Sequence, residues 1–449
     1  MSEKKYSYWL QSGVYSGLQK LTVVLFGFGT VIMLTRSMSK PEMGVWSLFL
    51  IFIGYIETIR TSLIKNAVIK YLNSAEKSEH VYVNSAALCL NVFITVGIAL
   101  LLAITIVPAS VFLKAPALSN VIFLFLPGML LLIPFSHFEW VQNANADFKG
   151  VFWAYLVRQG TSFVMISIDF IVHGHVDLIR LIIYFNAGIV LGTLTSYIFA
   201  RRFLRKQFIY SKEWLARMWH FGKYVFGTNL SASVFRNTDQ FIVSSVHGAA
   251  AVALYGVCVR ISNLVDVPSQ VLGDILFPKS AEVMREGNIE RVKFFYEKAV
   301  GVVMAICVPG SLFIFLLPKF ILGIVGGGEY VEAAYLLQLT MAYGMFLPFI
   351  KQFGTIMDST GFPKTNFLVM TIIAVINIGI CSVFAREFGI VGAAYGTMTS
   401  YLICFIITSA ILFKKFNASI TNCFKYMFQF YPEMYQLFQQ RFLLKLKAR

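Results

Sequence analysis

The chain has 449 residues, of which 57% are hydrophobic, 16% aromatic and only 13% charged, with 38 Lys and Arg against 22 Asp and Glu. An average soluble domain carries about 25% charged residues, and a soluble fold of this size has too little interior to bury so much apolar surface. The composition therefore excludes a water-soluble enzyme and a disordered chain. In a membrane protein a basic excess is first an orientation signal, so it does not indicate nucleic-acid binding.

Twelve apolar stretches are long enough to cross a bilayer as helices, which takes about 20 residues each. The runs are continuous rather than alternating, which disfavours the strands of a β-barrel. The first run is longer than the apolar part of a secretory signal, so we expect no cleaved signal. The predicted crossings are 12–35, 44–64, 81–107, 120–140, 151–173, 178–200, 221–246, 252–277, 299–325, 331–357, 365–385 and 390–413.

The basic residues are distributed unevenly over the two sides that this topology defines. The side of the N-terminus holds 26 of the 38 Lys and Arg residues, the opposite side holds five, and seven lie within crossings. This asymmetry predicts that both termini are cytoplasmic. The six Cys residues lie in crossings or in the C-terminal tail and form no CxxC pair, so neither disulfides nor a cysteine metal site is expected.

A basic stretch after the sixth crossing divides the chain in two. We predict an N-terminal six-helix lobe over 1–205, a cytoplasmic amphipathic linker over 206–220, a C-terminal six-helix lobe over 221–413 and a basic, amphipathic cytoplasmic tail over 414–449. Because six is even, the lobes share one orientation, as in transporters with parallel repeats. A thirteenth crossing in the tail is disfavoured by Lys425 and Pro432. The space between the lobes is then the expected place of function.

Four charged residues inside the crossings occur in pairs with helical spacing. Glu57 and Arg60 lie three residues apart in the second crossing, as do Arg236 and Asp239 in the seventh. An ionised side chain at the bilayer centre costs roughly 2.5–3.5 kcal/mol, and residues three apart share one helix face. Each pair therefore either neutralises itself within its helix or faces a polar cavity, and the sequence leaves both interpretations open.

Lys20 in the first crossing and Arg260 in the eighth have no acidic partner at helical spacing, which favours a water-filled cavity. Asp266 also lies inside the eighth crossing. A cavity with a cationic bias indicates an anionic cargo, and a phosphate or pyrophosphate suits the planar fork of arginine. Pro268, in the same crossing, removes a backbone hydrogen bond and predicts a kink.

Other polar residues have simpler interpretations. Arg158 and Lys351 lie near cytoplasmic helix ends and Arg180 near an external end, so all three are expected to snorkel. The external pair His173 and His175 lacks a carboxylate or Cys partner set for a metal. His137 and Glu139, near a cytoplasmic helix end, are expected at the interface and not in catalysis. Because the chain contains no GxxxxGK[ST], HExxH or GxSxG motif, we expect neither an enzyme nor a cofactor.

Several segments, taken in order, resemble one family of membrane transporters. They are Phe235-Arg236-Asn237-Thr238-Asp239-Gln240, Leu254-Tyr255-Gly256, Phe277-Pro278-Lys279-Ser280, Gly361-Phe362-Pro363-Lys364 and Phe388-Gly389-Ile390-Val391-Gly392. Their spacing is similar to that of the Wzx-like polysaccharide flippases, within the multidrug/oligosaccharidyl-lipid/polysaccharide exporter superfamily. The similarity extends over essentially the whole chain and is more diagnostic in the second half.

The resemblance implies an all-α integral membrane fold of about 12 helices, in two six-helix lobes that form a V-shaped bundle. It implies a flippase that moves undecaprenyl-pyrophosphate-linked oligosaccharide, a repeat unit of O-antigen, capsule or exopolysaccharide, from the cytoplasmic to the periplasmic leaflet of the bacterial inner membrane by alternating access. The implied partners are this lipid-linked substrate, membrane lipid, and a polysaccharide polymerase with its chain-length machinery.

The resemblance also implies binding residues. Related lipid II flippases carry cationic residues on helices one, two and eight, and by helix and approximate depth Lys20, Arg60 and Arg260 occupy similar positions, with Arg236 as an addition. The acidic residues Glu57, Asp239 and Asp266 are the candidates for ion coupling.

Two other functions are weighed against this one. A cation-coupled multidrug antiporter of the same superfamily is expected to have an acid-dominated cavity, which the cationic bias disfavours. An integral membrane transferase acting on a polyprenyl-linked sugar needs a catalytic cluster on a substantial loop, and the loops here are short.

Overall fold

The computed structural model describes residues 3–204 and 207–447, and all regular secondary structure in them is helical. By length and composition, nine helices in this part of the chain can cross a membrane, or ten if one bent pair counts as a single span. This confirms the predicted all-α membrane fold. The chain divides into two compact units, which we call unit 1 (1–233, 243–254 and 324–327) and unit 2 (234–242, 255–323 and 328–449).

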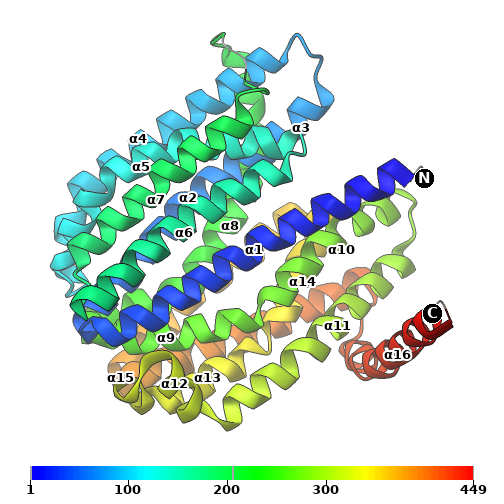
Figure 1. Cartoon of the computed structure of the whole chain (residues 1–449). Helices are drawn as coiled ribbons and strands as arrows, with labels where there is room; N and C mark the ends of the chain where they lie inside the picture. Colours follow the sequence, from blue (N-terminus) through cyan, green and yellow to red (C-terminus); the bar gives the residue numbers. More distant parts are fainter. Residues whose placement is uncertain (1–2, 205–206, 448–449) are drawn as a thin grey trace. The chain divides into compact units, whose positions relative to one another are not determined.

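Unit 1 is built from the first seven α-helices and most of the eighth. Their bounds are α1 Glu3–Ser37, α2 Lys40–Arg60, η1 Thr61–Lys65, α3 Asn66–Ser74, α4 His80–Phe112, α5 Ala117–Ala144, α6 Phe148–His173, α7 Leu178–Ala200 and α8 Lys212–His247. Figure 1 shows α4, α5 and α7 side by side, with α6 beside α7 and α1 packed on α6. Consecutive helices α4 and α5, and α6 and α7, pack as neighbours, whereas α5 packs mainly on α7 and α1 on α6.

Helices α6 and α7 approach closely because two glycines one turn apart face the contact. A side-chain carbon at Gly192 would lie 2.6 Å from Cβ of Arg158, and one at Gly188 would lie 2.4 Å from the Arg158 carbonyl oxygen. This Gly-xxx-Gly spacing is the one that lets membrane helices approach at backbone distance.

The start of α8 differs from the separate linker helix predicted over 206–220. One uninterrupted helix runs from Lys212 to His247, with its first turn capped by the Ser211 hydroxyl. Trp214 and Met218 are buried in a cluster with residues of α3, α4 and α5, whereas Trp219 is exposed. The apolar face that suggested an interfacial helix thus packs on protein.

Unit 2 contains the remaining helices. Their bounds are α9 Ala249–Val265, whose first turns belong to unit 1, α10 Val267–Arg285, α11 Ile289–Leu316, α12 Pro318–Gly326, whose last residues belong to unit 1, η2 Gly328–Ala333, α13 Ala334–Gly344, α14 Leu347–Ser359, α15 Pro363–Phe416 and α16 Ile420–Lys447.

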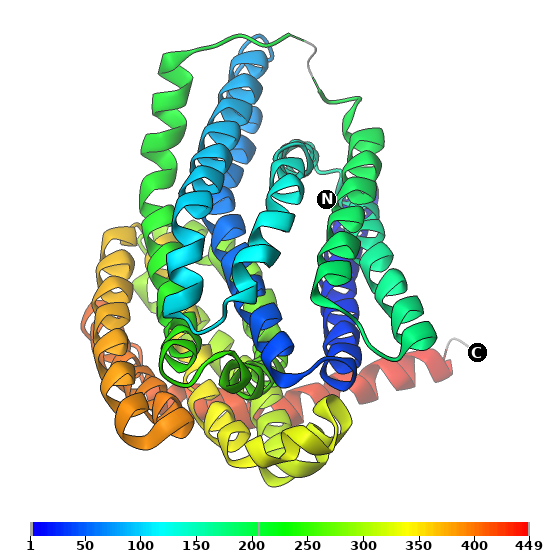
Figure 2. The same ribbon diagram turned by 90° about the vertical axis from the view of Figure 1, so that its left-hand side faces the viewer.

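Helix α15 contains both of the last two predicted crossings. They meet at Gly389, whose φ of 68° and ψ of −149° are not helical. The Cys381 thiol lies 3.6 Å from the Ala393 carbonyl oxygen, so the two arms fold back on each other, as the hairpin in Figure 2 shows. Essentially only glycine adopts this backbone region.

Prolines mark two helix breaks in unit 2. Helices α9 and α10 meet at a 45° bend, with Pro268 in the first turn of α10, which confirms the predicted kink. The predicted tenth crossing, 331–357, lies within one membrane-length span, Gly328–Ser359, in which a two-residue turn separates α13 from α14 and Pro348 lies in the first turn of α14. The predicted ninth crossing, 299–325, was misplaced: α11 begins at Ile289 with charged turns that hydropathy misses, and ends before Pro318.

The C-terminal helix α16 packs on α11. The Glu297 carboxylate accepts hydrogen bonds from the Ser419 amide at 2.7 Å and from the Asn422 side chain, and Tyr431 donates to the Ala305 carbonyl at 2.8 Å. Its placement on the inner leaflet stays a prediction.

Candidate functional site

Arg60, at the end of α2, is buried and bonded within unit 1. Its Nε donates to Asn91 of α4 at 2.9 Å, and one Nη donates to the Leu132 carbonyl and the Ser136 hydroxyl of α5 at 2.6 and 2.7 Å. Only 1% of Arg60 is exposed. The guanidinium therefore joins three helices, a role that hydropathy and spacing did not show.

Glu57 pairs with Arg158 of α6 rather than forming an ion pair with Arg60. The Glu57 carboxylate lies 3.0 Å from the Arg158 guanidinium, which also stacks over the Phe135 ring at 4.9 Å from its centre. Arg158 is 7% exposed at its side chain and Glu57 44%. Arg158 therefore does not snorkel as predicted, because a carboxylate on another helix supplies its partner.

Glu139 of α5 is a charged centre that the sequence interpretation placed at the interface. It is buried, and its carboxylate accepts from Lys65 at 2.8 Å, from Tyr155 at 3.0 Å and from Asn143 at 3.2 Å. Lys65 reaches it from η1, a π-helical turn that follows Arg60 directly. Such turns often occur at functional sites. In the sequence, the signal for this charged centre was an acidic residue inside a predicted crossing.

In unit 2, Asp239 and Arg236 of α8 point into different surroundings. Asp239 is 1% exposed and accepts from Tyr255 of α9 at 2.7 Å and from Thr397 of α15 at 3.3 Å, whereas Arg236 is exposed. Among the described residues no ion pair joins Arg236 to Asp239. Three residues on a helix differ by about 60° in direction, enough to bury one and expose the other.

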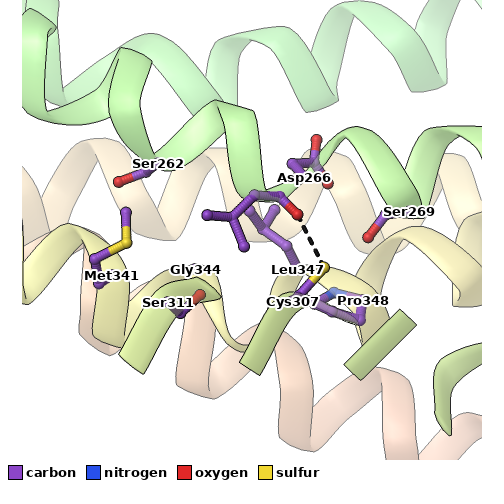
Figure 3. Close-up of a pocket in the computed structure, with 10 residues that line it drawn as sticks. Ser262, Asp266, Ser269, Cys307, Ser311, Met341, Gly344, Leu347 and Pro348 are labelled. Atoms are coloured by element: carbon purple, nitrogen blue, oxygen red, sulfur yellow. Dashed lines mark hydrogen bonds between the residues drawn. The ribbon is translucent and has the colours of Figure 1, made fainter. Parts of the chain in front are cut away.

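Asp266 occupies the break between α9 and α10 and forms an ion pair with Lys351 of α14. It is 7% exposed. Lys351 does not snorkel as predicted, because this carboxylate lies within its reach. Figure 3 shows Asp266 and Ser269 beside a small pocket of about 10 Å³, lined by residues of α9, α10, α11, α13 and α14. In the same pocket the Cys307 thiol donates to the Val265 carbonyl at the helix break.

The remaining two predicted binding residues lie on different units. Lys20 is partly exposed on α1 in unit 1. Arg260 is partly buried on α9 in unit 2, within electrostatic range of the Tyr330 phenol.

His173 and His175 each have polar partners in the structure. His173 lies 2.7 Å and Arg180 3.2 Å from the same buried Asp169 carboxylate oxygen, and His175 contacts the Ser37 carbonyl at 2.5 Å. Arg180 is thus paired rather than snorkelling alone. Within residues 3–204 and 207–447, no three His, Cys, Asp or Glu side chains are grouped to hold a metal ion.

The two units thus have different electrostatics. In unit 1, ion pairs and hydrogen bonds to carbonyl and amide oxygens stabilise the buried charges. In unit 2, one cation of α8 is exposed and one Lys–Asp pair borders a pocket. Such groups can bind and release a charged ligand, and exposed guanidinium groups match the oxygens of phosphate.

Comparisons with known proteins agree with this fold. The family model described as polysaccharide biosynthesis protein matches residues 9–284, and the model described as MatE matches 225–383. An uncharacterized membrane protein of Methanocaldococcus jannaschii is 24% identical over 244 residues, 53% of this chain and 48% of the relative. A probable low-salt glycan biosynthesis flippase of Haloferax volcanii is 20% identical over 186 residues, 41% of this chain and 39% of the relative. The chain thus spans half or less of the length of these two curated relatives.

Solved structures share the fold at low identity. An inward-facing multidrug resistance transporter of the MATE family superposes with a TM-score of 0.76 at 14% identity, covering 89% of this chain and 98% of that one. The inward closed conformation of a lipid II flippase gives 0.74 at 13% identity, covering 95% and 92%. Because the first family model covers more than half of the sequence, the chain belongs to the polysaccharide biosynthesis protein family.

Proposed function

We propose that the chain is a flippase that moves undecaprenyl-pyrophosphate-linked oligosaccharide from the cytoplasmic to the periplasmic leaflet of the bacterial inner membrane. The observation that carries the proposal is the polysaccharide biosynthesis family match together with cationic side chains inside membrane-length helices. The named function of the Haloferax relative, glycan biosynthesis flippase, supports the same cargo class.

The cargo's pyrophosphate is proposed to bind Lys20, Arg236 and Arg260. Arg236 is exposed and the other two are partly accessible, and guanidinium groups bind phosphate oxygens in a bidentate way. We assign Arg60 a supporting part: most of its donors are used within unit 1, so it fixes α2 and contributes positive charge. An inside-negative potential favours outward movement of the anion by about 2.3 kcal/mol per charge per 100 mV.

Alternating access is proposed to couple to an ion through Glu57, Asp239 or Asp266. All three carboxylates lie inside membrane-length or bent helices, and each has a cationic or hydroxyl partner that protonation would release. We further propose that both termini face the cytoplasm and that a polysaccharide polymerase, with its chain-length machinery, consumes the product.

The test is complementation of a deletion strain with Arg236→Ala and Arg260→Ala, read as lipid-linked repeat units accessible at the periplasmic face. We expect both variants to strand the units on the cytoplasmic leaflet and the Lys replacements to retain part of the export. Arg291→Ala is the matched control, because Arg291 is an exposed surface arginine paired with Glu286. Normal export by both alanine variants at normal protein levels would contradict the proposed binding residues.

A cation-coupled multidrug antiporter is the second candidate, favoured by the MatE match over residues 225–383 and by the MATE-like fold. Deletion then lowers resistance to cationic drugs and leaves the lipid-linked units on their usual leaflet. The two readouts in one deletion strain separate the candidates.

A further inference from the structure

The Lys351–Asp266 pair has a geometry that a static salt bridge does not require. The Lys351 side chain is 22% exposed, whereas that of Asp266 is 6% exposed. The lysine thus reaches accessible space while the carboxylate stays inside. The pair also lies at the bend between α9 and α10, a place where the backbone can change direction.

A second cation acts on the same lysine. Arg236 of α8 lies within electrostatic range of Lys351, and like charges repel. Arg236, Lys351 and Asp266 together carry one net positive charge. An anion that reached this group could therefore bind both cations. For Lys351 it would have to compete with the buried Asp266 carboxylate.

The Asp266 carboxylate has a second oxygen turned away from the lysine. Its Oδ1 is buried and has no hydrogen-bond partner within the described chain, and the same holds for the hydroxyl of Ser269, which is 2% exposed. Both residues line the pocket at the helix break, together with the hydroxyls of Ser262 and Ser311. A pocket lined by hydroxyls can admit water, which needs polar partners of this kind.

From these contacts, and resting on the proposed function, we propose that Lys351 is an exchangeable ligand for the cargo's phosphate. In the empty protein Lys351 pairs with Asp266. When a phosphate or pyrophosphate binds Arg236 and Lys351, the ammonium moves to it, and Asp266 takes up a proton that pocket water relays from bulk solution. The bond to that proton breaks in hydronium or a buffer acid, whose conjugate base stays in the solution. The lysine remains an ammonium throughout, so one O–H bond forms on Asp266 and one ion pair is exchanged for another.

The proton uptake follows from burial. A buried carboxylate that loses its cationic partner is costly to keep charged, and protonation removes that cost. The groups facing Asp266 from the neighbouring helices are Lys351 on α14, the Cys307 thiol on α11 and the Tyr401 phenol on α15. The Gln270 side-chain amide also donates to the carboxylate, at 3.3 Å, but it is neutral, so the departure of Lys351 removes the paired cation of Asp266.

The experiment titrates the full-length protein in detergent with farnesyl pyrophosphate, a soluble lipid pyrophosphate. Calorimetry in two buffers of different ionisation enthalpy gives the protons taken up per ligand bound. Any proton taken up by the ligand itself is the same for the wild type and for Asp266→Asn. The difference in proton uptake between the two proteins therefore gives the proton bound by Asp266.

We expect the wild type to take up more protons than Asp266→Asn near neutral pH. Asp266→Asn should bind the probe roughly tenfold more tightly, because no carboxylate competes for the lysine, and Lys351→Ala roughly tenfold to a hundredfold more weakly. Lys351→Arg should recover most of the affinity. Lys298→Ala is the matched control, since its ammonium lies 3.3 Å from Glu433 on a half-exposed surface, and it should match the wild type.

Equal proton uptake by the wild type and Asp266→Asn, or equally weak binding by Asp266→Asn and Lys351→Ala, overturns the exchange and assigns the pair a structural role. Either result leaves the flippase proposal standing. No binding of the probe by the wild type overturns the exchange and the proposed cargo class together.

Discussion

Substituting Arg60 by Ala separates a structural role from a cargo-binding role. The replacement removes three charge-assisted hydrogen bonds of 2.6–2.9 Å and leaves the Asn91 amide oxygen, the Leu132 carbonyl and the Ser136 hydroxyl without this donor inside unit 1. Leaving a buried neutral acceptor unsatisfied costs about 1–3 kcal/mol, so the three acceptors together give a loss of roughly 3–5 kcal/mol. In a chain of this length that loss corresponds to a melting temperature about 5 °C lower.

The assay is thermal unfolding of the purified full-length protein in detergent, followed by binding of farnesyl pyrophosphate below the transition. Arg60→Lys keeps the charge but not the planar fork, so it should lose about half as much stability. Lys298→Ala breaks a half-exposed pair and should change stability by less than about 1 kcal/mol. An unchanged melting temperature for Arg60→Ala, together with lost probe binding, would refute the structural reasoning and make Arg60 a cargo ligand.

Three further substitutions test the contacts that shape the units. Gly389→Ala places a side chain where φ is 68° and ψ is −149°, so it should lower folded yield, measured by fluorescence-detected size-exclusion chromatography. Gly192→Val should separate α6 from α7, because the new Cβ lies 2.6 Å from that of Arg158. We expect the melting temperature to fall by several degrees, and an unchanged melting temperature contradicts the close packing. Glu139→Gln leaves Lys65 without its 2.8 Å anionic partner and should reduce stability by about 1–3 kcal/mol, whereas Glu139→Asp should lose less.

Hydropathy was sufficient to predict the class of fold, because a bilayer demands long apolar helices whatever their tertiary contacts. It failed where helices continue through polar turns or stop inside apolar runs. The charged start of α11 at Ile289 is helical, and α11 stops before Pro318 although the apolar run continues. Helix continuity depends on backbone hydrogen bonds and proline positions, which a hydropathy window does not register.

The charged residues show a similar limit. Spacing correctly identified Glu57 as a residue in need of a partner, but the partner is Arg158, 101 residues later in the chain. Spacing also suggested Arg236 for Asp239, which instead bonds Tyr255 and Thr397. Local spacing reports which side chains share a helix face, whereas partners across helices depend on packing that one sequence does not display.

The exposure of paired charges indicates where each unit borders water or cargo. Glu57 is 44% exposed while its partner Arg158 is 7% exposed, and a carboxylate facing hydrocarbon at that depth is costly. The face of α2 that carries Glu57 is therefore hydrophilic in the membrane. By the same reasoning the exposed Arg236 marks a hydrophilic face of α8 in unit 2. A buried ion pair adds little net stability compared with apolar packing, so stability alone does not account for charges at these positions, whereas the proposed passage of a charged headgroup would.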